Sequence, residues 1–186
     1  MKKFELTSET KINIFGKKLF RIKALISFGD VEAGETGGWV EKEGNVNQSG
    51  NAWVSGNAEV YGNAKVSGNA WVYGDAEVSG NAKVYGNAKV YGDAWVYGNT
   101  KVYGDAWVSG NAEVSGNADY TTIHGFGTQF RTTTFFRCKD KKVRVACGCF
   151  FGTIPEFREQ VKNTRKGKIA EEYLMIADLM EKHFEK

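Results

Sequence analysis

The chain has 186 residues, of which 41% are hydrophobic, and it carries a net charge of +3. Its apolar runs are too short for a membrane-spanning helix, and its 23 Gly beside a single Pro exclude a collagen-like chain. The first residues lack the apolar segment of a signal peptide, and the odd number of Cys does not suit a secreted disulfide framework. We therefore expect a cytoplasmic protein without a membrane partner.

Residues 1–37 predict an N-terminal β-hairpin cap. Short apolar runs separated by polar turns indicate strands over Phe4–Leu6, Lys11–Phe15 and Leu19–Leu25, with Gly16 in a hairpin turn. A repeat array exposes its hydrophobic interior at each end, so such a cap is needed before the repeat that follows.

Residues 38–121 are built from a repeated unit of six residues. From Gly50 to Thr121 twelve units follow one another without insertion, and two looser units precede them. Most read Gly-Asn-Ala-x-Val-x, where Ala and Val alternate with variable positions as the inward and outward residues of a short strand do. Gly with Asn or Asp suits a corner, because these residues tolerate left-handed backbone angles. The period predicts a mainly β fold with a parallel β-helix.

This repeat resembles the hexapeptide-repeat superfamily, whose members form left-handed parallel β-helices. The resemblance implies triangular coils of three units, or 18 residues, so that residues 50–121 would supply about four coils. The segment from residue 34 to 46, together with the repeats, is similar to uncharacterised phage and prophage proteins and favours a viral origin. Relatives are commonly trimers, which predicts a homo-oligomer with the trimer as the first expectation.

Positions 18 apart would stack into outward columns, giving an aromatic, an acidic and a basic face. The acidic column would contain Glu59, Glu77 and Glu113 together with Trp95, and the basic column Lys65, Lys83 and Lys101 together with Asp119. The aromatic face would contain Trp53, Trp71, Tyr73, Tyr91 and Trp107. Exposed aromatic columns can stabilise a flat sheet, mediate self-association or stack against a ligand, and all three interpretations stay open.

Residues 122–186 predict a C-terminal α+β module, either a second cap or a recognition domain. A flexible link from His124 to Thr128 would lead into a hairpin of Gln129–Cys138 and Val143–Phe150. Thr153 and Glu156 form a capping-box pattern that starts a first helix. Apolar residues at helical spacing predict a second helix over Lys168–Phe184.

The C-terminal module contains 13 basic and 8 acidic residues, whereas the repeat contains 5 and 9. That asymmetry would steer anions to one end of the molecule. Arginine can hold a phosphate through two parallel hydrogen bonds, so we expect an anionic ligand, such as a nucleotide, at this hairpin. The predicted binding residues are Arg131, Phe135, Arg137, Arg144 and His124.

The sequence favours a non-enzymatic binding or scaffold protein without a cofactor. One alternative is a viral counter-defence protein that sequesters a nucleotide signal or blocks a host protein. Another is a degenerate acyltransferase, in which His124 would be the base, because the transferases resembled here use a histidine. A zinc site of Cys138, Cys147, Cys149 and His124 is a third possibility, although Cys-Gly-Cys is not a typical zinc motif and no metal is expected.

Overall fold

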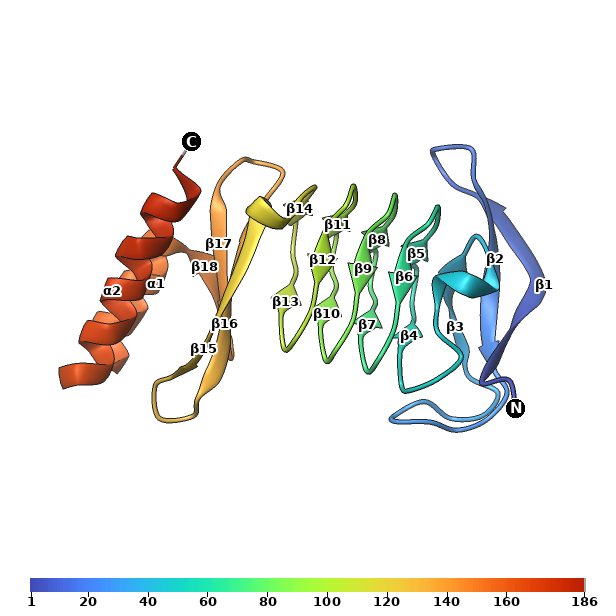
Figure 1. Cartoon of the computed structure of the whole chain (residues 1–186), viewed down its shortest axis with the longest axis horizontal. Coiled ribbons are helices and arrows are strands. Elements are labelled where there is room, and N and C mark those ends of the chain that lie inside the picture. Colours follow the sequence, from blue (N-terminus) through green and yellow to red (C-terminus); the bar gives the residue numbers. More distant parts are fainter. Residues whose placement is uncertain (186) are drawn as a thin grey trace.

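A computed structural model describes residues 1–185, which form an elongated molecule with a β-solenoid between two caps (Figure 1). The solenoid makes about four turns of two-residue strands, which confirms the β-helix repeat expected from the six-residue period. Its strands are β4 (Trp53–Val54), β5 (Glu59–Val60), β6 (Lys65–Val66), β7 (Trp71–Val72), β8 (Glu77–Val78), β9 (Lys83–Val84), β10 (Lys89–Val90), β11 (Trp95–Val96), β12 (Lys101–Val102), β13 (Trp107–Val108) and β14 (Glu113–Val114).

The solenoid strands stack in parallel into three sheets, one on each face. The aromatic face is β4-β7-β10-β13, the acidic face β5-β8-β11-β14 and the basic face β6-β9-β12. Residues 18 positions apart lie side by side, as Trp53 does with Trp71 and Lys65 with Lys83. The stacking of residues into columns, expected from the repeat, is therefore present.

Small side chains fill the solenoid and form its corners. Val72 and Ala76, like most of the equivalent residues, are fully buried. Gly68 has a φ of +69°, and a Cβ atom there would lie 3.0 Å from the backbone nitrogen of Gly86 in the next turn. A larger residue would be strained at this corner and would force the turns apart. The adjacent Asn69 donates a hydrogen bond to Asn87 at 3.0 Å, which links neighbouring turns.

The N-terminal cap is a hairpin extended by a third strand. It consists of β1 (Phe4–Ile12), β2 (Lys18–Ala24), β3 (Thr36–Val40) and a 3₁₀ turn, η1 (Glu43–Asn45). β1 pairs antiparallel with β2, and β3 pairs with β2 on one edge and with β5 on the other. β3 therefore continues the cap directly into the acidic face.

The prediction of a separate strand over Lys11–Phe15 is wrong. β1 continues to Ile12, and the chain turns immediately after it. The side-chain oxygen of Asn13 accepts hydrogen bonds from the backbone nitrogens of Phe15 and Lys17, at 3.1 and 2.9 Å. This asparagine sets the turn, and it places residues 14 and 15 at the tip of the hairpin.

The C-terminal module is a four-stranded antiparallel sheet covered by two helices (Figure 1). Its elements are η2 (Asn117–Asp119), β15 (Tyr120–Phe126), β16 (Arg131–Arg137), β17 (Val143–Cys147), β18 (Phe150–Thr153), α1 (Ile154–Thr164) and α2 (Gly167–Phe184). The expected capping box is present, since the Thr153 nitrogen donates to Glu156 Oε2 at 2.7 Å and the Glu156 nitrogen donates to Thr153 Oγ1 at 3.3 Å. Neither helix is long and apolar enough, over the described residues, to cross a membrane.

The C-terminal sheet has two more strands than the expected hairpin. His124 lies within β15 rather than in a flexible link, and β18 adds a strand directly before α1. One face of the sheet closes the end of the solenoid through Phe136 and Cys138. The other face carries the helices, with Phe135 and Val145 in their shared core.

Candidate functional site

The basic face carries a row of lysines that runs along the solenoid. Lys65, Lys83 and Lys101 occupy the same position in β6, β9 and β12 and are paired in register. All three side chains are exposed. Because neighbouring strands are about 4.8 Å apart, the row places like charges at short and regular intervals. We call these residues the lysine row.

The ammonium groups of the lysine row have no counter-charge within the described residues. Among residues 1–185, no ion pair, hydrogen bond or ring contact involves the ammonium group of Lys65, Lys83 or Lys101, although the backbone nitrogen of Lys101 donates to Asn117 Oδ1 at 2.9 Å. Like charges on neighbouring strands destabilise a sheet, so the row does not stabilise the fold. A one-signed surface of this kind instead attracts anions from solution.

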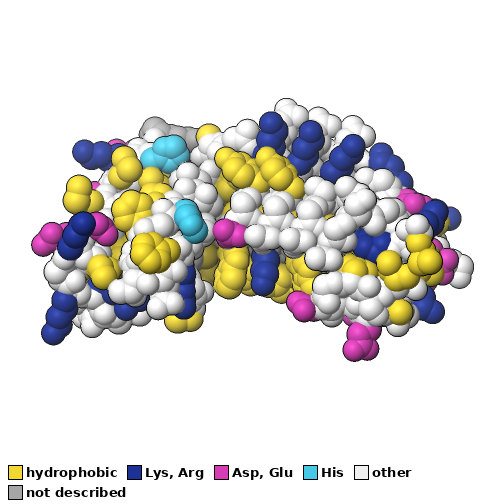
Figure 2. All heavy atoms as spheres, turned by 60° about the horizontal axis from the view of Figure 1, so that its bottom comes forward, with side chains coloured by type: hydrophobic (Ala, Val, Ile, Leu, Met, Phe, Trp, Pro, Cys, Tyr) yellow, Lys and Arg dark blue, Asp and Glu magenta, His cyan; other side chains and the backbone are white. Residues whose placement is uncertain are grey.

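The lysine row borders a long groove. One hollow of about 730 Å³ extends from the η1 segment to Lys101, and a second of about 450 Å³ continues toward β15. Tyr85 and Lys101 line both hollows, so the two form one continuous groove, which we call the basic groove. Figure 2 shows the row of basic side chains with hydrophobic side chains beside it.

The tyrosines of the basic groove stack on each other. The rings of Tyr85 and Tyr103 are nearly parallel, with centroids 5.4 Å apart, and Tyr103 meets the edge of Tyr120 at 6.5 Å. The two stacked rings cover one face of each other, although Tyr103 stays 52% exposed. The groove is therefore suited to recognition through charge and hydroxyl groups as well as through stacking on the exposed Tyr103 ring.

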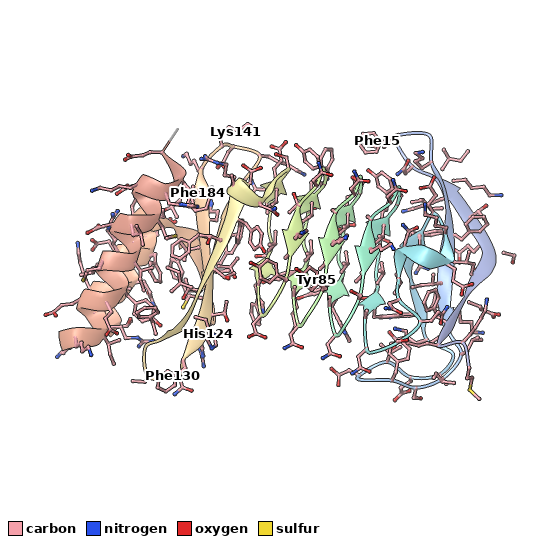
Figure 3. All side chains as sticks on the ribbon, in the orientation of Figure 1. Phe15, Tyr85, His124, Phe130, Lys141 and Phe184 are labelled. Carbon is pink, nitrogen blue, oxygen red and sulfur yellow. The ribbon has the colours of Figure 1, made fainter. Side chains whose placement is uncertain are left out.

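The acidic face differs because the caps supply its counter-charges. Lys11 of the β1–β2 hairpin lies 2.8 Å from the carboxylate of Glu59. Lys141, in the turn between β16 and β17, lies 3.0 Å from that of Glu113. Figure 3 shows Lys141 and Phe15 at the same edge of the molecule, Lys141 beside the C-terminal sheet and Phe15 nearer the N-terminal cap. Both cap hairpins therefore reach over this face.

The pKa values of two glutamates in the acidic column, Glu113 and Glu77, are shifted in opposite directions. The hydrogen bond from Lys141 lowers the pKa of Glu113. Burial raises the pKa of Glu77, although the Tyr61 hydroxyl donates a hydrogen bond to its carboxylate at 3.0 Å. Within the described chain, Glu77 has no ion pair, which distinguishes it from Glu59 and Glu113.

The expectation that the aromatic column is exposed throughout is wrong for Trp53, which is only 1% exposed. Phe4 and Phe28 of the N-terminal cap pack edge-on against its ring, at 6.2 and 5.4 Å. Trp107, at the other end of the column, is 37% exposed and lies under the ammonium group of Lys89.

The middle of the aromatic face consists of half-buried rings. Tyr73 and Tyr91 stack at 4.9 Å, next to the partly buried Trp71. Self-association through this face stays a prediction, and without Trp53 it would depend on these three rings and on Trp107.

The five residues predicted to bind an anion do not form one site. Phe135 is fully buried against Phe157, because its side of the sheet faces the helices, so its assignment to a ligand site is wrong. Arg137 donates to the backbone oxygen of Phe184 at 2.5 Å and stacks over its ring. Arg144 donates to the carboxylate of Asp140 at 2.7 Å.

His124 and Arg131 do lie together, in a hollow of about 600 Å³ at the joint between the solenoid and the C-terminal sheet. Trp107 and the exposed Phe130 line the same hollow. His124 Nδ1 lies 3.0 Å from the hydroxyl of Thr132. The structure thus joins two of the predicted binding residues with one member of the predicted aromatic face, while Figure 3 shows His124 and Phe130 on the opposite edge from Lys141.

The three cysteines are free thiols on different sides of the C-terminal sheet. Cys138 is buried in the core that closes the solenoid, and burial raises its pKa to about 11. Cys147 packs beside the core on the helix side, where Thr133 Oγ1 donates to its sulfur at 3.1 Å. Over residues 1–185 no three potential ligands converge on a metal position, so the zinc alternative with Cys149 and His124 does not fit the geometry.

The basic groove was visible in the sequence as a column but was not predicted as a site. The 18-residue spacing places Lys65, Lys83 and Lys101 on one face, and a signal was therefore present. The spacing could not show that lysines of the caps form ion pairs with the acidic column. Nor could it show that, over the described residues, no acid forms an ion pair with the lysine row.

The comparison with protein families supports the repeat architecture. A family model described as YdcK Beta solenoid repeat matches residues 58–74 and 82–98, both within the solenoid. No curated protein matches the chain. The family match is thus limited to part of the repeat and leaves both caps without a counterpart.

Proposed function

We propose that the protein is a non-enzymatic binding protein that holds an extended anion along the basic groove. The observation that supports this proposal is the lysine row, whose three exposed ammonium groups have no partner among residues 1–185. An anion in the groove would remove the repulsion between them. Binding would therefore gain both the new contacts and relief of an unfavourable arrangement.

The length of the row favours a linear polyanion over a single phosphate. Two steps of about 4.8 Å separate the first lysine from the last, so one small anion could contact only part of the row. A chain of phosphates running parallel to the solenoid axis could meet all three lysines. Inorganic polyphosphate and a single-stranded oligonucleotide share this chemistry, and a sequestered nucleotide signal with several phosphates would fit the same description.

The test is a titration of the protein with fluorescein-labelled oligo(dT) of about 12 nucleotides and, separately, with inorganic polyphosphate. The parent chain is compared with a variant carrying Lys65→Gln, Lys83→Gln and Lys101→Gln. The matched control carries Lys23→Gln, Lys166→Gln and Lys182→Gln, which removes the same charge from exposed positions elsewhere. Each titration is repeated at about 50 and 200 mM salt.

We expect the groove variant to lose affinity about 100-fold and the control to change little, since each lost phosphate contact weakens binding and flattens its salt dependence. For three contacts to a single strand, the slope of log affinity against log salt should fall by about 2. Equal binding by the groove variant and the control would contradict the proposal. Binding of oligo(dT) without polyphosphate binding would instead point to base recognition in the groove.

The left-handed, hexapeptide type of the solenoid and a phage or prophage origin belong to the same proposal and depend on the resemblance of the repeat alone. A cytoplasmic location and a homotrimer are likewise proposed. An acyltransferase using His124 has weaker support, because over the described residues the His124 ring forms a hydrogen bond only with the hydroxyl of Thr132, although Asp105 and Cys149 line the same hollow. Sedimentation of the purified chain tests the trimer directly.

A further inference from the structure

A second hollow lies on the acidic face, under the tip of the β1–β2 hairpin. Its volume is about 450 Å³. The side chains that define it come from the hairpin and from three successive levels of the solenoid. With Val96, the lining residues are Phe15, Tyr61, Glu77, Ser79, Trp95 and Tyr97. We call this hollow the aromatic cage, because four of the seven are aromatic.

The hairpin tip closes one side of the aromatic cage. The ring of Phe15 lies 6.0 Å from that of Tyr61 and 6.0 Å from that of Trp95, which it meets edge-on. Phe15 nevertheless stays 52% exposed. The Asn13 turn therefore holds an apolar ring over the solenoid without filling the space beneath it.

The cage also contains a carboxylate that forms no direct ion pair over the described residues. Glu77 accepts a hydrogen bond from Tyr61 but forms no ion pair over the described residues, whereas Glu59 and Glu113 in the same column are paired with cap lysines. Burial raises the pKa of Glu77 and outweighs the positive charges of Lys139 and Lys11, which lower it. A half-buried charge without a direct ion pair is costly. A bound cation would supply the direct ion pair that this carboxylate lacks.

The ring of Trp95 already attracts a cation from within the chain. Lys139 Nζ lies 4.5 Å from the centroid of the Trp95 ring while it donates to the backbone oxygen of Asp93. The position of Lys139 shows that the indole ring of Trp95 attracts a cation. Lys139 is not among the residues that line the cage, so it does not fill the cage. The face of an indole is the aromatic surface that binds cations best.

We infer that the aromatic cage binds a small organic cation, such as a quaternary or methylated ammonium group. Aromatic rings around one carboxylate suit a cation that carries methyl groups and sheds water readily. A metal ion would find only one carboxylate in the cage, and a neutral apolar ligand would bury the Glu77 charge without compensating it. This inference does not depend on the basic groove, which lies on another face.

The experiment is a calorimetric titration with choline and with 3,3-dimethylbutan-1-ol, which has the same shape without the charge. We expect choline to bind about tenfold more tightly than the alcohol, as cation–π and carboxylate contacts require. Trp95→Leu and Glu77→Gln should each reduce choline affinity about tenfold or more. The amide oxygen of Gln can still accept the Tyr61 hydrogen bond, so Glu77→Gln remains informative if Trp95→Leu does not fold.

The controls are Trp107→Leu and Glu171→Gln, which remove the same side-chain types at exposed positions outside the cage. Both should bind choline as the parent does. The Lys65→Gln, Lys83→Gln, Lys101→Gln variant should also bind it normally, so failure of the basic groove would leave this result intact. No choline binding, equal binding of choline and the alcohol, or unchanged binding by Glu77→Gln would overturn the inference.

Discussion

The acidic and basic faces are built from the same repeat on the same solenoid, yet the caps supply ion-pair partners to the acidic face and none, over the described residues, to the lysine row. Lysines from both cap hairpins lie against the acidic column, at 2.8 Å from Glu59 and 3.0 Å from Glu113. Over the described residues no acid pairs with the lysine row, and Glu43, which lines the same groove, pairs with Lys2 at 2.7 Å instead. Alternating outward residues would allow either face to be paired, so the repeat alone does not explain the difference.

The difference separates columns that hold the molecule together from columns that are open to a partner. Where the caps supply lysines to a column, as they do to Glu59 and Glu113, its side chains have partners and contribute to the fold. Where the caps supply no counter-charge, like charges remain side by side at a cost in stability. The aromatic column contains both cases, because the cap buries Trp53 and leaves Trp107 at the surface.

The largest expected effect tests this distinction within the aromatic column. Trp53→Ala should lower the free energy of unfolding by about 3–5 kcal/mol, because it removes a buried ring from the contact with Phe4 and Phe28. Trp107→Ala should lower it by less, about 1 kcal/mol, since Trp107 is already 37% exposed. Denaturant unfolding of both variants measures the difference. Similar losses at the two positions would mean that the cap does not cover Trp53 in solution.

A smaller effect should have opposite signs on the two charged faces. Lys11→Gln breaks the ion pair with Glu59 and should lower the free energy of unfolding by about 0.5–1 kcal/mol. Neutralising Lys65, Lys83 and Lys101 together should raise it slightly, because repulsion along the row disappears. Thermal unfolding at low salt makes the comparison most sensitive, and added salt should shrink both changes. Destabilisation by the triple change would mean that the row has a hidden partner.

The smallest expected effect concerns pH and two glutamates of one column. The folded chain holds Glu113 below its usual pKa of 4.5, so its stabilising contribution is present above that pH and is lost as the pH falls through the lowered value. Glu77 has a raised pKa, so stability falls as the pH rises from 4.5 through the raised value.

At neutral pH, Glu113→Gln should therefore destabilise the protein and Glu77→Gln should stabilise it. The Glu77 difference should vanish at about pH 3, where its carboxyl is protonated in the folded and unfolded chains alike, and the Glu113 difference should shrink as the pH falls through the lowered pKa of Glu113. Unfolding measured at the two pH values tests the assignment. A loss of stability in Glu77→Gln at neutral pH would show that its carboxylate has a cationic partner in the folded protein.

The sequence predicts the repeating part of the fold well, because the residues that determine the corner and the strand of each unit lie within that unit. Gly68 and Asn69 define a corner locally, and Val72 must point inward in a strand of alternating residues. The Thr153–Glu156 capping box is equally local. The turn at Asn13 was missed because it depends on a side chain bonding to two later backbone groups, a pattern that the runs of apolar residues hide.

The candidate site could be predicted only in part, because it depends on contacts between distant segments. Phe28 lies 25 residues before Trp53 and covers it, which no repeat pattern could indicate. The alternation along β16 correctly places Phe135 and Arg137 on one side of the strand. It does not indicate which side of the strand the helices cover. Likewise, the sequence shows that the lysine row is positively charged. That the row has no ion-pair partner over the described residues could be established only once the positions of both caps were known.

Lysine acetylation followed by mass spectrometry tests the central claim most directly, with and without polyphosphate. If the basic face is open and the acidic face is covered, Lys65, Lys83 and Lys101 will react fast in the free protein and become protected by the polyanion. Lys3 is 2% exposed and donates to two backbone oxygens in the cap, so it should react slowly in both samples. Slow reaction of the lysine row in the free protein, or protection by polyphosphate at other lysines only, would contradict the account.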